Sequence, residues 1–152
     1  MSQQQAKAKL EARSETEITR AILQALNLEP GVFAFRINVG SVTAEHKGKQ
    51  RYVRFGFRGQ SDIIGWKREY AGTQGGLNRW FPRWLALEVK RPDQVPNVLA
   101  GFVIGSPRRY LTTAGTARVR AEQQRAFLQR VRAAGGIAWV VTSTDEARAA
   151  VK

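Results

Sequence analysis

The chain has 152 residues, the size of one domain with one hydrophobic core. Its 25 Lys and Arg against 12 Asp and Glu give a net charge of +13, so we expect a polyanionic partner. No basic amphipathic helix with a large aromatic face is evident, which favours nucleic acid over an acidic membrane surface. The chain has no Cys. This excludes a disulfide scaffold, a thiolate metal site and a cysteine nucleophile, and it is typical of a reducing cytoplasm.

The first predicted element is a helix that follows a polar, basic extension over residues 1–13. Ser14 and Glu17 have the spacing of a capping box. The pattern predicts a helix that ends in a turn at Pro30 and Gly31, at the start of a single domain over residues 14–152. The apolar residues at helical spacing are Ile18, Ala21, Ile22, Ala25 and Leu26.

Glu15 lies in the first turn of this helix. At about 100° per residue, it falls in the middle of the stripe formed by Ile18, Ile22 and Leu26, so we expect it to face inward. Two interpretations remain open. Glu15 is either an acid that the helix dipole favours in a first turn or part of a functional site.

Residues 32–38 alternate like a strand, and residues 42–45 and 51–57 read as a hairpin with a turn over 47–50. Five cations and three aromatic residues are interleaved between Glu45 and Asp62, with no acid among them. Such a window suits contacts with phosphates and bases. The other interpretation is a solvated strand pair that covers the core. The cations predicted to bind DNA are Lys47, Lys49, Arg51, Arg54 and Arg58.

Two acids stand inside strand-like apolar runs, Asp62 in residues 60–66 and Glu88 in residues 84–90. A buried carboxylate is costly unless a cation compensates it. Strand side chains alternate between faces, so Glu88 and Lys90 project to the same side. We therefore expect two acids and a lysine around one point, with a positive ion between the acids.

The remaining elements have weaker signals. Residues 67–82 read as a flexible loop with a glycine-rich stretch, and residues 93–119 as mostly loop because Pro and Gly interrupt any helix. A second helix is predicted over residues 120–134, stopped by Gly135 and Gly136. A buried strand over residues 137–142 and a terminal helix over residues 145–151 follow.

Gln124 lies on the apolar face of the second helix. It precedes the predicted core residues Phe127, Leu128, Val131 and Ala134 at helical spacing. A buried amide needs a hydrogen-bond partner. That partner is either a nearby backbone group or one of the proposed catalytic acids or the lysine.

Taken together, the ordered motifs resemble the VRR-NUC domain of the PD-(D/E)xK nucleases, the restriction-endonuclease-like superfamily. The resemblance covers about residues 14–143. The motifs are the first-helix acid, Ser-Asp at 61–62, Glu-Val-Lys at 88–90, Gln-Arg-x-Phe-Leu at 124–128 and Ala-Ala-Gly-Gly at 133–136. The resemblance implies a single α/β domain with a central mixed β-sheet flanked by helices in the order αβββαβ. Ser61 stands where the superfamily name has proline.

The resemblance also implies roles for particular residues. Asp62, Glu88 and the main-chain carbonyl of Val89 correspond to metal ligands, and Lys90 to the lysine that orients or activates the attacking water. Glu15 resembles the family's first-helix acid, and Gln124 the glutamine of its last core helix. Carboxylate ligands without Cys suit Mg²⁺ or Mn²⁺ rather than Zn²⁺.

The expected function is a Mg²⁺- or Mn²⁺-dependent endonuclease that hydrolyses phosphodiester bonds in DNA. Stand-alone members of the family resemble Holliday-junction resolvases, which are small homodimers that cut branched DNA. This implies a homodimer in the cytoplasm of a bacterial or phage-infected host cell. Two alternatives stay open: a non-catalytic, basic DNA-binding module, and an inactive nuclease-like protein whose acids and lysine are structural.

Overall fold

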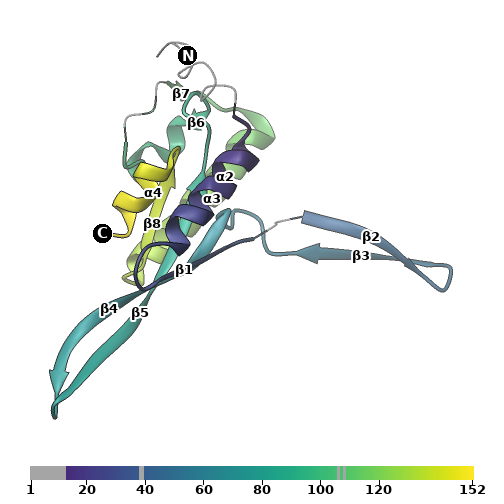
Figure 1. The fold of residues 1–152 in the computed structure, drawn as a ribbon. Helices are drawn as coiled ribbons and strands as arrows, with labels where there is room; N and C mark the ends of the chain where they lie inside the picture. Colours follow the sequence, from purple (N-terminus) through teal and green to yellow (C-terminus); the bar gives the residue numbers. More distant parts are fainter. Residues whose placement is uncertain (1–12, 38–39, 106, 108) are drawn as a thin grey trace, which may run out of the picture.

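A computed structural model describes residues 13–37, 40–105, 107 and 109–152 (Figure 1). Residues 1–12 of the expected basic extension lie outside this range. The centre is a four-stranded mixed sheet in the order β1-β4-β5-β8, in which β1, β4 and β5 are antiparallel and β8 is parallel to β5. The strands are β1 (Val32–Arg36), β4 (Ile63–Gln74), β5 (Leu77–Val89) and β8 (Ile137–Val141). The expected α/β class is confirmed.

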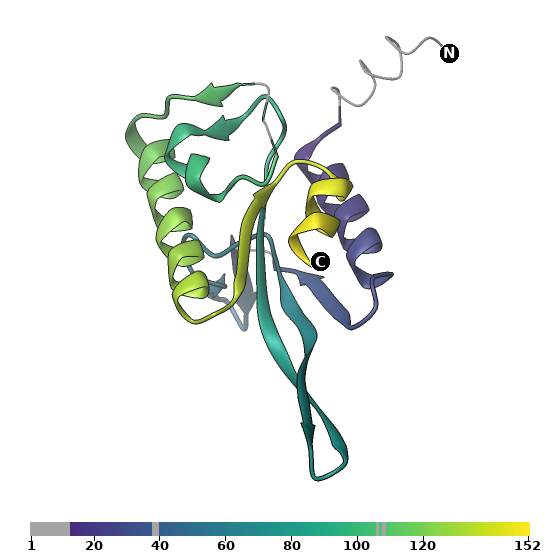
Figure 2. The ribbon, with the colours of Figure 1, turned by 90° about the vertical axis from the view of Figure 1, so that its left-hand side faces the viewer.

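Helices cover both faces of the sheet (Figure 2). Helices α2 (Glu15–Asn27) and α4 (Thr144–Ala150) pack on one face, and α3 (Gly115–Ala133) packs on the other against β5 and β8. The central strand β5 is therefore enclosed on two sides, and residues 85–89 are fully buried. That explains the continuous apolar run in which Glu88 stands.

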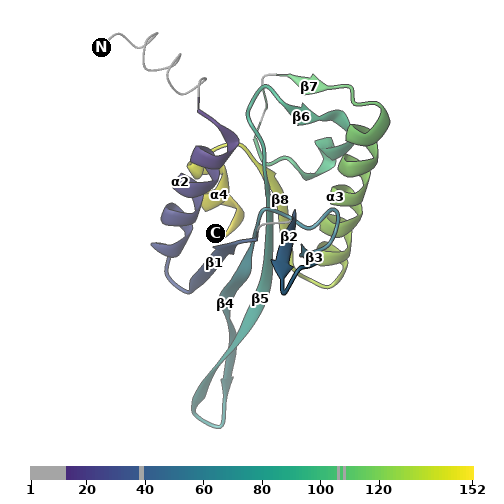
Figure 3. The same ribbon diagram turned by 90° about the vertical axis from the view of Figure 1, so that its right-hand side faces the viewer.

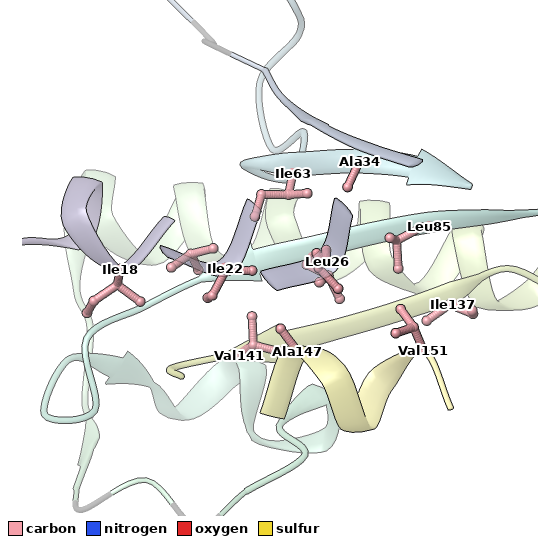
Figure 4. Packing of buried hydrophobic residues seen from close by; sticks show 12 residues of the cluster. Ile18, Ile22, Leu26, Ala34, Ile63, Leu85, Ile137, Val141, Ala147 and Val151 are labelled. Carbon is pink, nitrogen blue, oxygen red and sulfur yellow. The ribbon is translucent and has the colours of Figure 1, made fainter. Parts of the chain in front are cut away.

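Helix α2 begins as the sequence predicts. The Ser14 hydroxyl accepts a hydrogen bond from the Glu17 amide at 3.3 Å, and the Glu17 carboxylate accepts one from the Ser14 amide at 2.8 Å. The apolar stripe of α2 lies against β4, β5, β8 and α4 (Figure 4). Ile22 and Leu26 are fully buried there. This packing fixes the first turn of α2, and with it Glu15, relative to the sheet.

The predicted first hairpin is confirmed as β2 (Gly40–His46) and β3 (Lys49–Phe55). Its turn has two residues, Lys47 and Gly48, both with positive φ, rather than the expected four. Two residues with positive φ are typical of a type I′ turn, whose twist matches that of the flanking strands. The hairpin projects away from the central sheet (Figure 1).

The prediction of a flexible loop over residues 67–82 is wrong. Strands β4 and β5 continue through this segment as a hairpin that extends beyond the rest of the fold (Figure 3). Gly75 and Gly76 form its two-residue turn, with φ of 60° and 79°. The glycine pair supplies the type I′ geometry, and aromatic residues of high β-propensity pair across the strands. We call residues 66–84 the β4–β5 arm.

The prediction that residues 93–119 are mostly loop is wrong for the part of this range that the structure describes, because more than half of it has regular structure. They contain β6 (Val95–Pro96), a 3₁₀ helix η1 (Asn97–Phe102) and β7 (Tyr110–Leu111). Helix α3 begins at Gly115 rather than Arg120, and no side chain caps its N-terminus. Ala134, predicted in the core, is exposed because it ends the helix. No helix in the described part of the chain is long and apolar enough to span a membrane.

Candidate active site

The predicted acids meet where the β4–β5 ladder ends. Ile63 and Leu87 are the last paired residues of the two strands. Beyond them, Oδ2 of Asp62 accepts a hydrogen bond from the amide of Val89 at 2.9 Å. A side-chain carboxylate thus takes the place of a ladder carbonyl. Asp62 is held beside the C-terminal end of β5, next to Glu88.

Glu88 lies on the face of β5 that α3 covers and is fully buried. Its Oε1 accepts hydrogen bonds from the Nζ of Lys90, at 2.7 Å, and from the side-chain amide of Gln124. The expectation that Glu88 and Lys90 share one side of the strand is confirmed. Its other oxygen, Oε2, is buried and has no hydrogen-bond partner among the described residues.

Gln124 is only 4% exposed and donates to Glu88 across the interface between α3 and β5. Of the two interpretations given to this buried amide, the local backbone partner is therefore wrong. The helical spacing correctly placed Gln124 inward, and the partner is a predicted site acid. This contact fixes the orientation of the Glu88 carboxyl group.

Glu15 is half-buried in the first turn of α2. Its negative charge acts on both Glu88 and Lys90. The charge of Glu15 therefore reaches this group, whereas the direct ion pair with Lys90 is made by Glu88. The apolar stripe of α2 carried the information that located Glu15.

The electrostatics of the group are dominated by burial. Burial raises the pKa of Glu88 from its ordinary 4.5 to about 8, with Asp62 and Glu15 adding to the rise and Lys90 opposing it. Burial alone would lower the pKa of Lys90, but attraction to Glu88, Glu15 and Asp62 outweighs it and raises that pKa. Three carboxyl groups thus act on the charge of one ammonium group, and Glu88 forms the direct ion pair with it. A further cation would relieve the excess of acidic groups.

The oxygens of this group suit a divalent ion. Oε2 of Glu88 lacks a hydrogen-bond partner among the described residues. The Asp62 carboxylate accepts the hydrogen bond from the Val89 amide through its Oδ2 atom. The N–H and C=O of one strand residue point to the same side, so the carbonyl of Val89 faces the Asp62 side of β5. Across the described ranges, no three Asp, Glu or His side chains form a metal site by themselves. The ligands that the family resemblance implies are two carboxylates and one main-chain carbonyl, so this site does not need three acidic or histidine side chains.

A cleft of about 730 Å³ opens beside Gln124. Arg58, Gly59 and Gln60 form one wall, and the N-terminal half of α3, including Arg120 and Gln123, forms the other. Gly59 has a φ of +82°, and a Cβ there would lie 2.6 Å from the main-chain carbonyl of Gln123. The wall is therefore seated directly on α3. We call this cavity the Arg58–Arg120 cleft.

Arg120 was not among the residues predicted to bind DNA. It stands one helical turn before Gln124, so the helical period places it on the same side of α3. That spacing is the signal in the sequence that could have identified it. The opposite wall of the cleft, which residues 58–60 form, could not be predicted from the sequence, because it lies about 60 residues away in the chain.

The cations predicted to bind DNA are in different places. Arg58 lines the cleft together with Gln124, whereas Lys47 and Lys49 are exposed at the end of the β2–β3 hairpin. The side chains of Arg51 and Arg54 lie outside the described part of the chain. Phe57 contacts Phe127 of α3 edge-on, with ring centroids 5.4 Å apart. This contact ties the segment after the hairpin to the helix that carries Gln124.

No family model, curated protein or solved structure matches this chain.

Proposed function

We propose that this protein is a metal-dependent endodeoxyribonuclease of the restriction-endonuclease-like type, with Mg²⁺ or Mn²⁺ as its cofactor. The order of elements supports the proposal, because the elements that form the sheet and cover its two faces occur along the chain as α2, β1, β4, β5, α3 and β8, which is αβββαβ, with β6, η1 and β7 inserted between β5 and α3 and with α4 following β8. The β2–β3 hairpin is an insertion between the first two strands of that order. The net charge of +13 fits DNA as the substrate.

The observation that carries the proposal is the buried, unpartnered Oε2 of Glu88 next to Asp62 and Lys90. In a purely structural ion pair, buried oxygens are normally satisfied by hydrogen bonds. A non-catalytic DNA-binding module gains nothing from acids that repel phosphate. A divalent ion between Asp62 and Glu88 would account for the unpartnered Oε2 atom and for the presence of acids in a basic protein.

Each residue then has a defined task. Asp62, Glu88 and the carbonyl of Val89 would hold the ion, which supplies polarisation of the phosphoryl oxygen and a lower pKa for the attacking water. Lys90 is held by Glu88 and places a positive charge beside the phosphate. Gln124 keeps the Glu88 carboxyl group in position, and Glu15 helps to keep Lys90 protonated.

For the substrate, we propose branched DNA, cut by a homodimer of the resolvase kind. A two-fold dimer would present two such sites to two strands. Arg58 and Arg120 line the cleft that also contains Gln124, the partner of Glu88, and they would contact backbone phosphates near the scissile bond.

Asp62→Ala tests the proposal. We expect this variant to lose metal-dependent cleavage while it keeps DNA binding, because the acid is needed for the ion and not for the affinity. Cleavage of linear, flapped and four-way DNA with Mg²⁺ or Mn²⁺ measures the first property, and anisotropy of labelled DNA the second. Asp93→Ala is the matched control, since Asp93 is an exposed acid that pairs with Arg91.

Retained cleavage in purified Asp62→Ala protein would contradict the assignment. Calorimetric titration of Mg²⁺ into the wild-type protein separates the alternatives. A non-catalytic module or a structural ion pair predicts no binding heat and no cleavage, together with DNA binding that high salt weakens.

A further inference from the structure

The face of the sheet that carries Glu88 continues, uncovered, along the β4–β5 arm. Paired residues of antiparallel strands lie on one face, so the register can be followed outward from the acids. The pair Ile64 and Ala86 comes first, followed by Trp66 with Trp84, Arg68 with Pro82, and Tyr70 with Trp80. Helix α3 covers this face only over β5 and β8.

Aromatic rings dominate the uncovered part. Trp66 and Trp84 are 39% and 46% exposed, and Tyr70 and Trp80 about half exposed. Phe33 of β1, paired with Trp66, stacks on its ring at a centroid distance of 4.6 Å. The five rings Phe33, Trp66, Tyr70, Trp80 and Trp84 therefore form a single exposed surface, which we call the aromatic track.

The charge on the track is one-sided. Arg68 is the charged residue of the track and lies between the pairs Trp66–Trp84 and Tyr70–Trp80. The Arg68 guanidinium lies 4.7 Å from the centre of the Trp80 ring. The acid of the arm, Glu69, projects to the opposite face, where it pairs with Arg83. Exposed rings accompanied by an arginine and no acid are the combination that binds single-stranded nucleic acid, because bases stack on the rings and the cation attracts phosphate.

The direction of the track connects it to the acids. At about 3.3 Å per strand residue, Trp84 lies roughly 13 Å and Trp80 roughly 26 Å along β5 from Glu88. A strand of DNA that enters the site can thus continue along the same sheet face. We propose that the aromatic track binds an unpaired strand of DNA next to the cleavage position, with its bases stacked on Trp66, Trp84 and Trp80.

The inference rests on the proposed nuclease function, and it names the substrate class as DNA with a single-stranded segment several nucleotides long beside the cut. A second copy of the chain is the competing occupant of this surface. A two-fold contact there would bring each Arg68 against a surface that offers it no acid, so the charge pattern favours DNA. A dimer would use another surface.

Trp80→Ala is the test and Phe81→Ala its matched control. Phe81 is the next residue of β5, similarly exposed, and projects to the opposite face. Anisotropy of a labelled oligothymidine, in EDTA and at moderately high salt, measures stacking without cleavage. We expect Trp80→Ala to weaken binding about 5- to 100-fold and Phe81→Ala to weaken it less than twofold. Trp80→Phe should retain most of the affinity, and binding of blunt duplex DNA should be equal in all variants.

Equal losses in Trp80→Ala and Phe81→Ala, or no loss in either, would overturn the inference. So would sedimentation that shows a wild-type dimer and a monomeric Trp80→Ala protein with unchanged oligothymidine binding, because the track would then be a contact between copies. The nuclease proposal is judged separately by cleavage with metal. Selective loss of oligothymidine binding in a protein that never cleaves DNA supports the track and refutes the enzyme.

Discussion

The two carboxyl oxygens of Glu88 have different surroundings. Oε1 accepts from Lys90 and Gln124, while Oε2 is buried without a partner. Without a metal ion, the cheapest way to keep such a group buried is to protonate it, which is why its pKa rises to about 8. Binding a divalent ion requires the deprotonated form, so ion binding and proton release are coupled at this residue.

Glu88 therefore makes stability depend on pH in the absence of metal. Between its ordinary pKa of 4.5 and about 8, the unfolded chain carries an ionised Glu88 and the folded chain a protonated one. The unfolded state binds fewer protons, so the free energy of unfolding falls as pH rises through this window, by a few kcal/mol at most. Glu88→Gln cannot ionise and should lack this decline.

Urea denaturation of both proteins in EDTA, at several pH values between 4.5 and 8, measures the effect. The Glu88→Gln protein should gain in stability relative to the wild type as pH increases. Parallel profiles would mean that Glu88 is already ionised in the folded protein. Added Mg²⁺ should stabilise the wild type at pH 8 and have little effect on Glu88→Gln.

Gln124 acts on the proposed metal site through Glu88. In Gln124→Leu, Oε1 keeps Lys90 as its donor but the carboxyl group is free to turn, so we expect the Mg²⁺ concentration needed for half-maximal cleavage to increase about 10- to 100-fold. Gln129→Leu, an exposed change on the same helix, is the control. A Gln124→Leu protein with unchanged Mg²⁺ dependence would assign Gln124 to packing only.

At the scale of elements, local signals were read correctly and pairing over distance was not. Helix α2 could be predicted because Ser14, Glu17 and the apolar stripe lie within a few turns. The start of α3 at Gly115 could not be predicted, because no side chain caps the helix at Ala114 and the sequence therefore has no capping signal there. The β4–β5 arm was missed because its two faces are both largely exposed, so the alternation of apolar and polar residues that marks a half-buried strand is absent.

The candidate site divides in the same way. Glu88 and Lys90 follow from strand alternation, and Glu15 and Gln124 from the helical period, because each depends on a single element. The Arg58–Arg120 cleft depends on how the segment before β4 packs on α3, which no local pattern encodes. Gly59 is the point of contact between them.

Gly59→Ala tests that contact. The change places a Cβ 2.6 Å from the Gln123 main chain, at a φ of +82°, so the segment must move away from α3. Gly48→Ala, with a φ of +71° and nothing within 4 Å, is the matched control for backbone strain, which costs about 1–2 kcal/mol. Thermal unfolding should show a clearly larger loss for Gly59→Ala, with reduced cleavage. Equal losses would mean that the contact with α3 contributes nothing.

At the scale of the whole molecule, two hairpins project in different directions from a small core (Figure 1). The β2–β3 hairpin carries Lys47 and Lys49 at its exposed end, and the β4–β5 arm carries the aromatic track. Part of the positive charge therefore lies on a projecting hairpin, away from Glu88 and Lys90. Such a shape suits a branched substrate, whose arms diverge from one point.

The hairpin end should contribute sequence-independent affinity. Lys47→Glu with Lys49→Glu removes two predicted phosphate contacts, so the slope of log K against log salt should become shallower by about 2. Cleavage at saturating DNA should not change. Arg130→Glu, an exposed cation in the last turn of α3, is the control. An unaltered slope in the double variant would place DNA elsewhere on the surface.

Asp62 accepts a hydrogen bond from the amide of Val89 in place of a carbonyl of the ladder. This structural role could be filled by any side chain of the same length with an acid or amide group. A descendant of this protein that had abandoned catalysis would still have reason to keep Asp or Asn at position 62. An acid at this position is therefore poor evidence that a relative is active. The buried Oε2 atom of Glu88, which has no hydrogen-bond partner among the described residues, is the better indicator of activity.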